Sequence, residues 1–315
     1  MVFHILLKLL ISSWLATVVM SASECSKCLG MFCGRINTEN MTDCTLNCRA
    51  CPRGYRTDGY ICQKCNQTFE LYDWLFLGFM ALCVTVLHFY AIDAFHSSHR
   101  RVWFLHASAL LECVTSFMSM VLLFEPIGSF QLYKCGVKSI KDWYTVFFNP
   151  KPMYLSTIHC TQEAVYPLFT SVFIYLLFSF ITMIILRGIL LRIIFQNLGR
   201  SPLYAGLYII PIVGTVHTCF SGVIYYIFPY LALFLSAVGV AVFLSMLDGN
   251  YYQKVRKPRH VGVLVCYCIA HAYGIISITE FELPIRDGTV LLLVFLPFCF
   301  YSITRPFTDA DNFKI

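Results

Sequence analysis

Long apolar segments separated by shorter polar ones occupy most of the chain. After residue 70 there are seven, at about 71–92, 102–124, 166–186, 204–226, 230–247, 261–279 and 289–303. A helix needs about 20 apolar residues to cross the hydrocarbon of a bilayer, and most of these segments approach that length. The pattern therefore predicts an all-α polytopic membrane protein, with a domain of seven transmembrane helices at residues 71–303.

The first 22 residues form an apolar segment of another kind. Lys8 precedes an apolar run from Leu9 to Met20, and small residues follow it. This order is typical of a cleaved signal peptide, and an uncleaved signal anchor is the alternative. In both cases residues 23–70 are translocated, so we expect a lumenal domain there.

Positive charges are unevenly divided between the segments that connect the apolar runs. The segments 93–101, 187–201, 248–260 and 304–315 carry Arg100, Arg101, Arg187, Arg192, Arg200, Lys254, Arg256, Lys257, Arg259, Arg305 and Lys314. The opposite segments carry Lys134, Lys138, Lys141, Lys151 and Arg286, and the first four of these share one long loop at about 125–165. Because cytosolic loops are enriched in Lys and Arg, we expect a lumenal amino terminus and a cytosolic tail at 304–315.

Composition agrees with a membrane protein. Apolar residues make up 58% and charged residues 13% of the 315 residues. A soluble chain with so few charges could not keep its surface in water. The net charge of +6 follows the membrane topology, so it does not indicate a nucleic-acid partner.

Eight closely spaced cysteines mark the predicted lumenal domain. They are Cys25, Cys28, Cys33, Cys44, Cys48, Cys51, Cys62 and Cys65. An even number of cysteines in a short translocated segment favours a disulfide framework, because so small a domain lacks a sufficient core. The alternative is a zinc site built from the two C-x2-C pairs, Cys48/Cys51 and Cys62/Cys65. A redox-active C-x2-C is less favoured, since no strand–helix pattern surrounds either pair.

Two further features belong to the lumenal side. Cys135 and Cys160 both lie in the long loop, so we predict a bridge between them, whereas the cysteines within the spans should stay reduced. Glycosylation sequons begin at Asn40 and Asn66. Asn66 lies about five residues before the first span, so Asn40 is the better acceptor.

Glu112 is the one acidic residue deep within a predicted span. A charge there costs about 2.5–3.5 kcal/mol on insertion scales, so the residue is either a proton or ion site or a hydrogen-bonded link between helices. The histidines His88, His106, His217 and His271 are scattered over four spans and do not predict a metal site. No Gly-x-Ser-x-Gly, His-Glu-x-x-His or P-loop motif occurs, so we expect neither an enzyme nor a cofactor.

Several strings in order along the chain carry a family resemblance. They are CLGMFCG (28–34), CPRGYRT with CQKC (51–65), ELYDWLFLGFM (70–80), the DWYT…NP…HCT-E-AVYPL run (142–168) and HAYGIIS (271–277). The chain resembles the JNK-associated membrane protein (JAMP) family from about Cys28 to Phe307. Cys25 and Cys44 are additional to the six family-like cysteines of the lumenal domain, and their joint presence suggests an extra bridge between them.

The resemblance implies a non-enzymatic adaptor of the endoplasmic-reticulum membrane. Members of the family are membrane anchors that recruit proteasomes, ubiquitin ligases and the segregase of the degradation pathway, and that bind stress-activated Jun N-terminal kinase. The basic segment with Lys254, Arg256, Lys257 and Arg259 is the candidate docking site, and obedience to the positive-inside rule is its simpler explanation. The alternatives are a seven-span receptor with a ligand-binding cysteine-rich domain, and a transporter that uses Glu112.

Overall fold

The computed structural model describes residues 26–28, 32–36, 48–52, 54–96, 102–144, 167–193, 201–246 and 255–308. The chain divides into two compact units. The first, here called the head, is Met1–Gln67 together with Lys134–Tyr166, and the second, the helical unit, is Thr68–Tyr133 together with Pro167–Ile315. The long loop predicted at 125–165 is thus shared between the two units, and its larger part belongs to the head.

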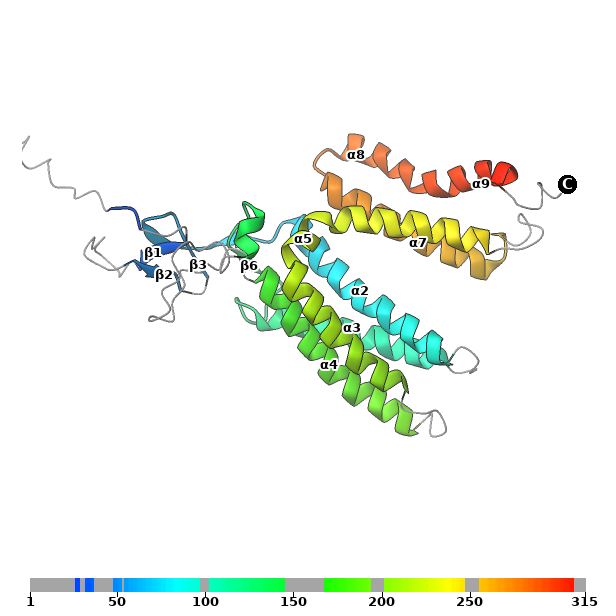
Figure 1. Ribbon diagram of the computed structural model, residues 1–315, viewed down its shortest axis with the longest axis horizontal. Coiled ribbons are helices and arrows are strands. Elements are labelled where there is room, and N and C mark those ends of the chain that lie inside the picture. The colour runs from blue at the N-terminus through cyan, green and yellow to red at the C-terminus, as the bar shows by residue number, and fades with distance from the viewer. Residues whose placement is uncertain are drawn as a thin grey trace, which may run out of the picture. The chain divides into compact units, whose positions relative to one another are not determined.

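The described part of the head contains a small sheet (Figure 1). Its strands are β1 (Cys33–Ile36), β2 (Arg49–Ala50), β3 (Tyr55–Thr57) and β4 (Ile61–Lys64), in the order β2-β1-β4-β3. β1 and β4 are parallel and the other two pairs are antiparallel. Gly34 permits close packing at its centre, because an added Cβ would lie 2.7 Å from the Thr57 hydroxyl and 2.9 Å from the Cys62 sulfur.

Two short strands lie where the chain passes from the head into the helical unit and back. β5 (Gln67–Thr68) pairs with β6 (Tyr133–Lys134). A short 3-10 helix, η1 (Ile140–Trp143), follows in the head part of the long loop. The amide N–H of Phe69 donates to the Leu132 carbonyl at 3.1 Å beside this strand pair.

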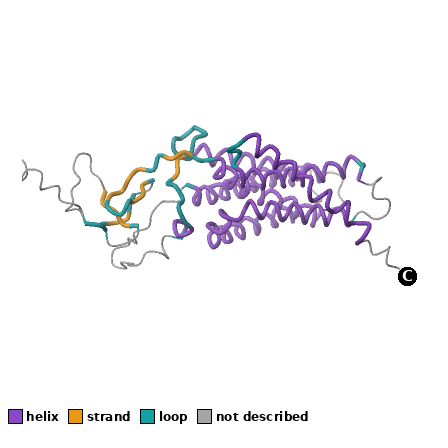
Figure 2. The backbone as a smooth tube through the Cα atoms, turned by 90° about the horizontal axis from the view of Figure 1, so that it is seen from above, coloured by secondary structure: helices purple, strands orange, loops and turns teal. Residues whose placement is uncertain are grey.

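The helical unit contains the predicted spans. Its elements are α2 (Leu71–His96), α3 (Val102–Leu123), α4 (Leu168–Ile193), α5 (Ser201–Ser245), α7 (Pro258–Thr279), α8 (Pro284–Val290), the 3-10 helix η2 (Leu291–Phe295) and α9 (Leu296–Thr308). Apolar residues occur on every face of α2 and α4, as expected for helices in contact with both lipid and neighbouring helices. In the described ranges six helices are long and apolar enough to cross a membrane, the last of them formed by α8, η2 and α9 together. Figure 2 shows the helices lying alongside one another.

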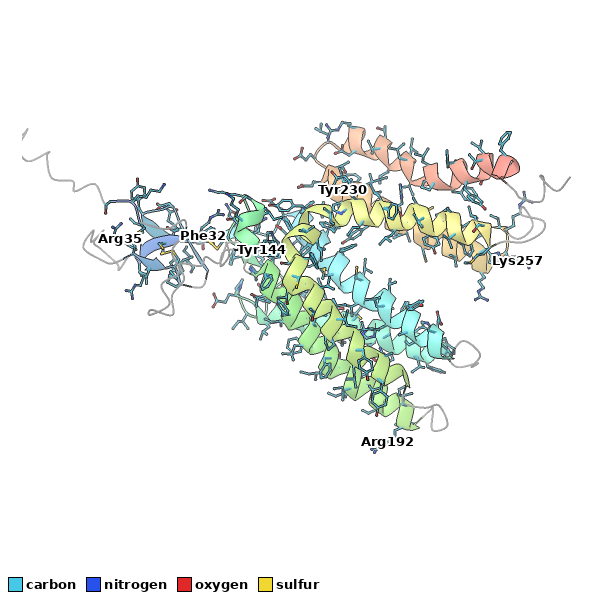
Figure 3. The ribbon with its side chains drawn as sticks, in the orientation of Figure 1. Phe32, Arg35, Tyr144, Arg192, Tyr230 and Lys257 are labelled. Atoms are coloured by element: carbon cyan, nitrogen blue, oxygen red, sulfur yellow. A yellow bond between two sulfur atoms is a disulfide. The ribbon has the colours of Figure 1, made fainter. Side chains whose placement is uncertain are left out.

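α5 differs most from the predicted pattern. The expected spans 204–226 and 230–247 form one helix of 45 residues. At a rise of about 1.5 Å per residue it is roughly twice as long as the ~30 Å hydrocarbon core. Figure 1 shows that it has two arms, one beside α4 and one beside α7, joined by a sharp bend, and Figure 3 labels Tyr230 there. The count of seven separate helices is therefore not confirmed by the structure.

The bend occurs where a proline interrupts the hydrogen bonds of α5. Pro229 has no N–H, so the carbonyl of Tyr225 lacks its usual intrahelical donor. The Tyr72 hydroxyl of α2 donates to that carbonyl instead, at 2.7 Å. On the other side Gly274 of α7 approaches so closely that an added Cβ would lie 2.9 Å from the Pro229 carbonyl oxygen. Helices α2 and α7 thus hold the bend between them.

Each arm of α5 has its own packing. Phe228 is fully buried at the bend, with ring centroids 5.9 Å from Phe76 and 5.5 Å from Phe79 of α2. Val240 and Leu244 of the second arm are buried in a cluster that includes residues of α7 and α9. α9 therefore packs against the core, although most of the apolar segment Arg286–Thr304 that contains it is exposed.

Candidate functional site

Disulfides hold the head together, as predicted. The structure contains the bridges Cys28–Cys48, Cys51–Cys62 and Cys65–Cys135, and Cys33 is also disulfide-bonded. The members of each C-x2-C pair therefore bond to different partners. No thiolate remains at either pair to bind zinc, so the zinc alternative is wrong for these four cysteines.

The predicted bridge between Cys135 and Cys160 is wrong, because Cys135 is bonded to Cys65. The cause is strand pairing. β5 begins two residues after Cys65 and β6 ends one residue before Cys135, and their pairing brings the two Cα atoms within 4.8 Å. Cys25, Cys44, Cys160 and Asn40 lie outside the described residues, so the suggested Cys25–Cys44 bridge stays a prediction.

An ion pair also links the cysteine-rich sheet to the segment after β6, inside the head. Arg56 of β3 donates to the carbonyl of Gly136 and lies 3.4 Å from the Asp142 carboxylate. That carboxylate also accepts the backbone N–H groups of Lys138 at 2.8 Å and Ser139 at 3.2 Å, and its residue is 4% exposed. The segment after β6 is thus folded onto the cysteine-rich sheet. No sequence pattern indicates this contact, since its partners are 86 residues apart.

Glu112 belongs to a buried ion pair in the helical unit. One carboxylate oxygen of Glu112 lies 2.6 Å from Nη2 of Arg187, and the other lies 3.3 Å from its Nε. The Ser108 hydroxyl donates to the second oxygen at 2.6 Å. Both charged side chains are 0% exposed. The pair therefore joins α3 to α4, and both oxygens of the carboxylate accept hydrogen bonds.

This arrangement corrects the assignment of Arg187 to a cytosolic segment. α4 continues to Ile193, so Arg187 lies within the helix rather than after it. The charge of Arg187 is tolerated there because the carboxylate of Glu112 neutralises it and accepts its hydrogen bonds. One turn farther along α3, the hydroxyls of Ser116 and Thr182 lie 2.9 Å apart and extend the polar contact between the two helices.

The four histidines of the spans are dispersed, as expected. His217 lies 3.0 Å from the Phe169 carbonyl, and His271 lies 2.8 Å from the Ser236 hydroxyl. His106 lies 3.2 Å from the Asp93 carboxylate. His88 is fully buried, and its ring nitrogens have no hydrogen-bond partner in the described part of the chain. The first three join neighbouring elements, so the geometry is that of packing residues.

The predicted docking segment lies at the start of α7. Arg256, Lys257 and Arg259 are exposed there, and Lys254 lies outside the described residues. Lys257 is the N-cap residue, and the first turn contains no acidic side chain (Figure 3). The positive end of the helix dipole adds to these charges. Within the ranges that the structure covers, none of the three cations forms an ion pair, so they can meet an anionic surface.

Taken together, the six apolar helices of the described ranges and the disulfide-bonded head define a polytopic membrane protein with a small disulfide-rich domain. The described residues contain no group of three or more metal-binding side chains.

Comparison with known sequences then identifies the family. The chain matches the model of the family described as JNK1/MAPK8-associated membrane protein over residues 28–310, and it belongs to that family. It is 40% identical to the human JNK1/MAPK8-associated membrane protein over 295 residues, which cover 90% of this chain and 94% of the relative. Identity is 39% to the mouse protein over the same length and 30% to a Caenorhabditis elegans homolog over 310 residues, with the same coverage. No solved structure matches the chain.

Proposed function

We propose that this chain is a non-enzymatic adaptor of the endoplasmic-reticulum membrane. In this proposal it binds the JNK1/MAPK8 kinase and recruits proteasomes, ubiquitin ligases and the segregase that clear misfolded proteins. Membership of the family supports the kinase, because the relatives' name states that association for them. The observation that carries a docking role is the exposed basic start of α7, which has no acidic neighbour in its first turn.

The topology proposed with this function has seven crossings, a lumenal head and a cytosolic carboxyl terminus. The two arms of α5 would each cross the membrane. Gly206, near the start of the first arm, lies against His88 in the second half of α2. The Tyr225 hydroxyl, near the bend, donates to the Asp73 carboxylate at the start of α2, at 3.0 Å. The first arm therefore runs antiparallel to α2. In the second arm Ser236 contacts His271 of α7. Figure 1 shows that this arm turns back at the bend.

A single cysteine tests this topology. Tyr230 is 61% exposed at the bend. In intact microsomes Tyr230→Cys should be protected from a membrane-impermeant maleimide until the vesicles are opened, whereas Arg256→Cys should react at once. Immediate labelling at both positions would contradict two crossings by α5.

The basic segment suits long-range attraction to acidic protein surfaces. Clustered charges raise association rates, and the effect falls as salt concentration rises. The hydrogen bonds of Glu112 favour an adaptor over a transporter. A transporter would need this carboxylate free to bind a proton or ion, whereas here it is hydrogen-bonded to Arg187 and Ser108. The head then supplies a lumenal surface while the start of α7 faces the cytosol.

Charge reversal tests the docking role. Arg256, Lys257 and Arg259 are replaced together by Glu, and the protein is purified in mild detergent. The expected result is loss of co-purifying proteasome subunits and kinase, and slower turnover of a misfolded lumenal substrate. The matched control reverses three exposed cations of the head, Arg49, Lys64 and Lys138.

Two outcomes would overturn parts of the proposal. Unchanged recovery of partners in the reversed protein, with its glycosylation pattern preserved, would remove this segment as the docking site. If deletion of the whole protein left both proteasome recruitment to the membrane and substrate turnover unchanged, the adaptor function itself would be wrong.

A further inference from the structure

A groove runs between α3 and α4 on the surface of the helical unit. It has a volume of about 360 Å³. Its walls are two stripes at helical spacing: Phe104, Ala107, Ser108 and Leu111 from α3, and Leu186, Ile189, Leu190 and Ile193 from α4. Each stripe follows the i, i+3, i+4, i+7 pattern of one helix face, so the groove runs parallel to both helices.

The lining of the groove is almost wholly apolar. Leu111, Ile189 and Ile193 are 52%, 53% and 67% exposed, so their side chains form open walls. The small side chains of Ala107 and Ser108 leave room close to the backbone of α3. The Ser108 hydroxyl donates to Glu112 at 2.6 Å, so its proton is already engaged. A hydrocarbon chain fits this lining better than a polar ligand does.

A positive charge lies at the end of the same helix pair. Arg192 is exposed in the last turn of α4 (Figure 3), and it precedes Ile193 of the groove wall in the sequence without itself lining the groove. The side chain of an arginine can extend to the headgroup layer while its aliphatic stem stays in the apolar region. In the described part of the chain Arg192 forms no ion pair. It therefore offers an anionic phosphate a charge partner at the groove's end.

We propose that the α3–α4 groove binds one anionic phospholipid, with an acyl chain between the two helices and the headgroup at Arg192. The topology proposed above assigns this end to the cytosolic leaflet, where anionic lipids are concentrated. The buried pair of Glu112 and Arg187 fixes the two helices on the inner side of the groove, so its shape is preformed. Ordinary lipid would touch any exposed apolar face, whereas this site prefers a charged headgroup.

Photoaffinity labelling in nanodiscs tests the preference. Two probes carry the same diazirine-bearing acyl chain and differ only in their headgroup, phosphatidylserine or phosphatidylcholine. We expect the phosphatidylserine probe to label peptides of α3 and α4 about fivefold more than the other, the factor that one basic residue near a membrane surface supplies. In Arg192→Gln the two probes should label the protein equally. In Arg259→Gln, which removes an exposed cation at α7, the phosphatidylserine probe should keep its advantage.

A second variant tests the groove itself. Ala107→Phe fills the groove floor and should abolish labelling there by both probes. Leu110→Phe, at a 51% exposed position of α3 that does not line the groove, is the matched control. Equal labelling by the two probes in the unaltered protein would mean that bulk lipid fills the groove, and the proposal would be wrong. It would also be wrong if Ala107→Phe left labelling unchanged, or if a co-purifying membrane protein displaced both probes.

Discussion

Removal of Glu112 should destabilise the helical unit more than removal of its partner. In Glu112→Leu the guanidinium of Arg187 loses its counter-charge inside a buried site where both side chains are 0% exposed. Loss of one member of a buried ion pair typically costs about 3–5 kcal/mol. An arginine side chain cannot relieve this cost by losing its proton, because guanidinium groups stay protonated in proteins.

In Arg187→Met the remaining carboxyl group can take up a proton. It also keeps its contact with the Ser108 hydroxyl, which lies 2.6 Å from Glu112 Oε1. The loss should then be about 1–3 kcal/mol, the range for a buried polar group with an unmet hydrogen bond. The double variant Glu112→Leu with Arg187→Met removes both charges and should return close to the stability of the unaltered protein.

Thermal unfolding in detergent, followed with a thiol-reactive dye, measures this order. Cys113 is 4% exposed and becomes reactive when the helices separate, so it reports on the contact under study once the exposed thiols Cys219, Cys266 and Cys299 are replaced by Ala in every variant. The expected order of midpoints is Glu112→Leu lowest, Arg187→Met next, and the double variant highest of the three. If the effects of the two single changes simply added in the double variant, the two side chains would not be coupled. A lower midpoint for Arg187→Met than for Glu112→Leu would mean that the unpaired guanidinium escapes to the membrane surface.

Three further predictions concern the bend and the head. Tyr72→Phe should lower stability by about 1 kcal/mol, because the α5 carbonyl at the proline bend then loses its donor, and the same dye assay measures this. Endoglycosidase treatment should shift the mass of the unaltered protein and leave that of Asn40→Gln unchanged, because Asn66, although exposed, lies only five residues before α2. Peptide mapping without reduction should recover Cys65 linked to Cys135, and labelling of either residue as a free thiol would contradict the pairing.

The apolar pattern predicted the helices well where a charge or a polar loop ends them. The segments expected at 102–124 and 261–279 correspond to α3 (Val102–Leu123) and α7 (Pro258–Thr279). The pattern predicts that the third span ends at 186, because Arg187 is the first charge after the apolar run. Arg187 stays inside α4 because it pairs with Glu112. That partner lies 75 positions earlier in the chain. Hydropathy along one segment cannot detect a charge that another segment neutralises.

The apolar pattern could not predict the bend of α5 either. A proline within an apolar run can kink a helix, end it or be absorbed. Which of these occurs depends on what satisfies the freed carbonyl. Here the Tyr72 hydroxyl does so, and Gly274 lets α7 approach the Pro229 carbonyl. The chain therefore turns without a polar loop, and the helix is continuous through the turn.

The Cys65–Cys135 bridge has a different role from the other disulfides of the head. It closes a segment of 70 residues that contains α2 and α3. For a free chain, closure of such a segment would contribute about 4 kcal/mol in the chain-entropy model. Two helices already inserted in a bilayer have lost most of that freedom, so the gain from closure is smaller. The bridge acts mainly on position: together with the Arg56–Asp142 ion pair it keeps the segment after β6 on the cysteine-rich sheet. Any partner of the head would therefore meet the sheet and this segment as one surface.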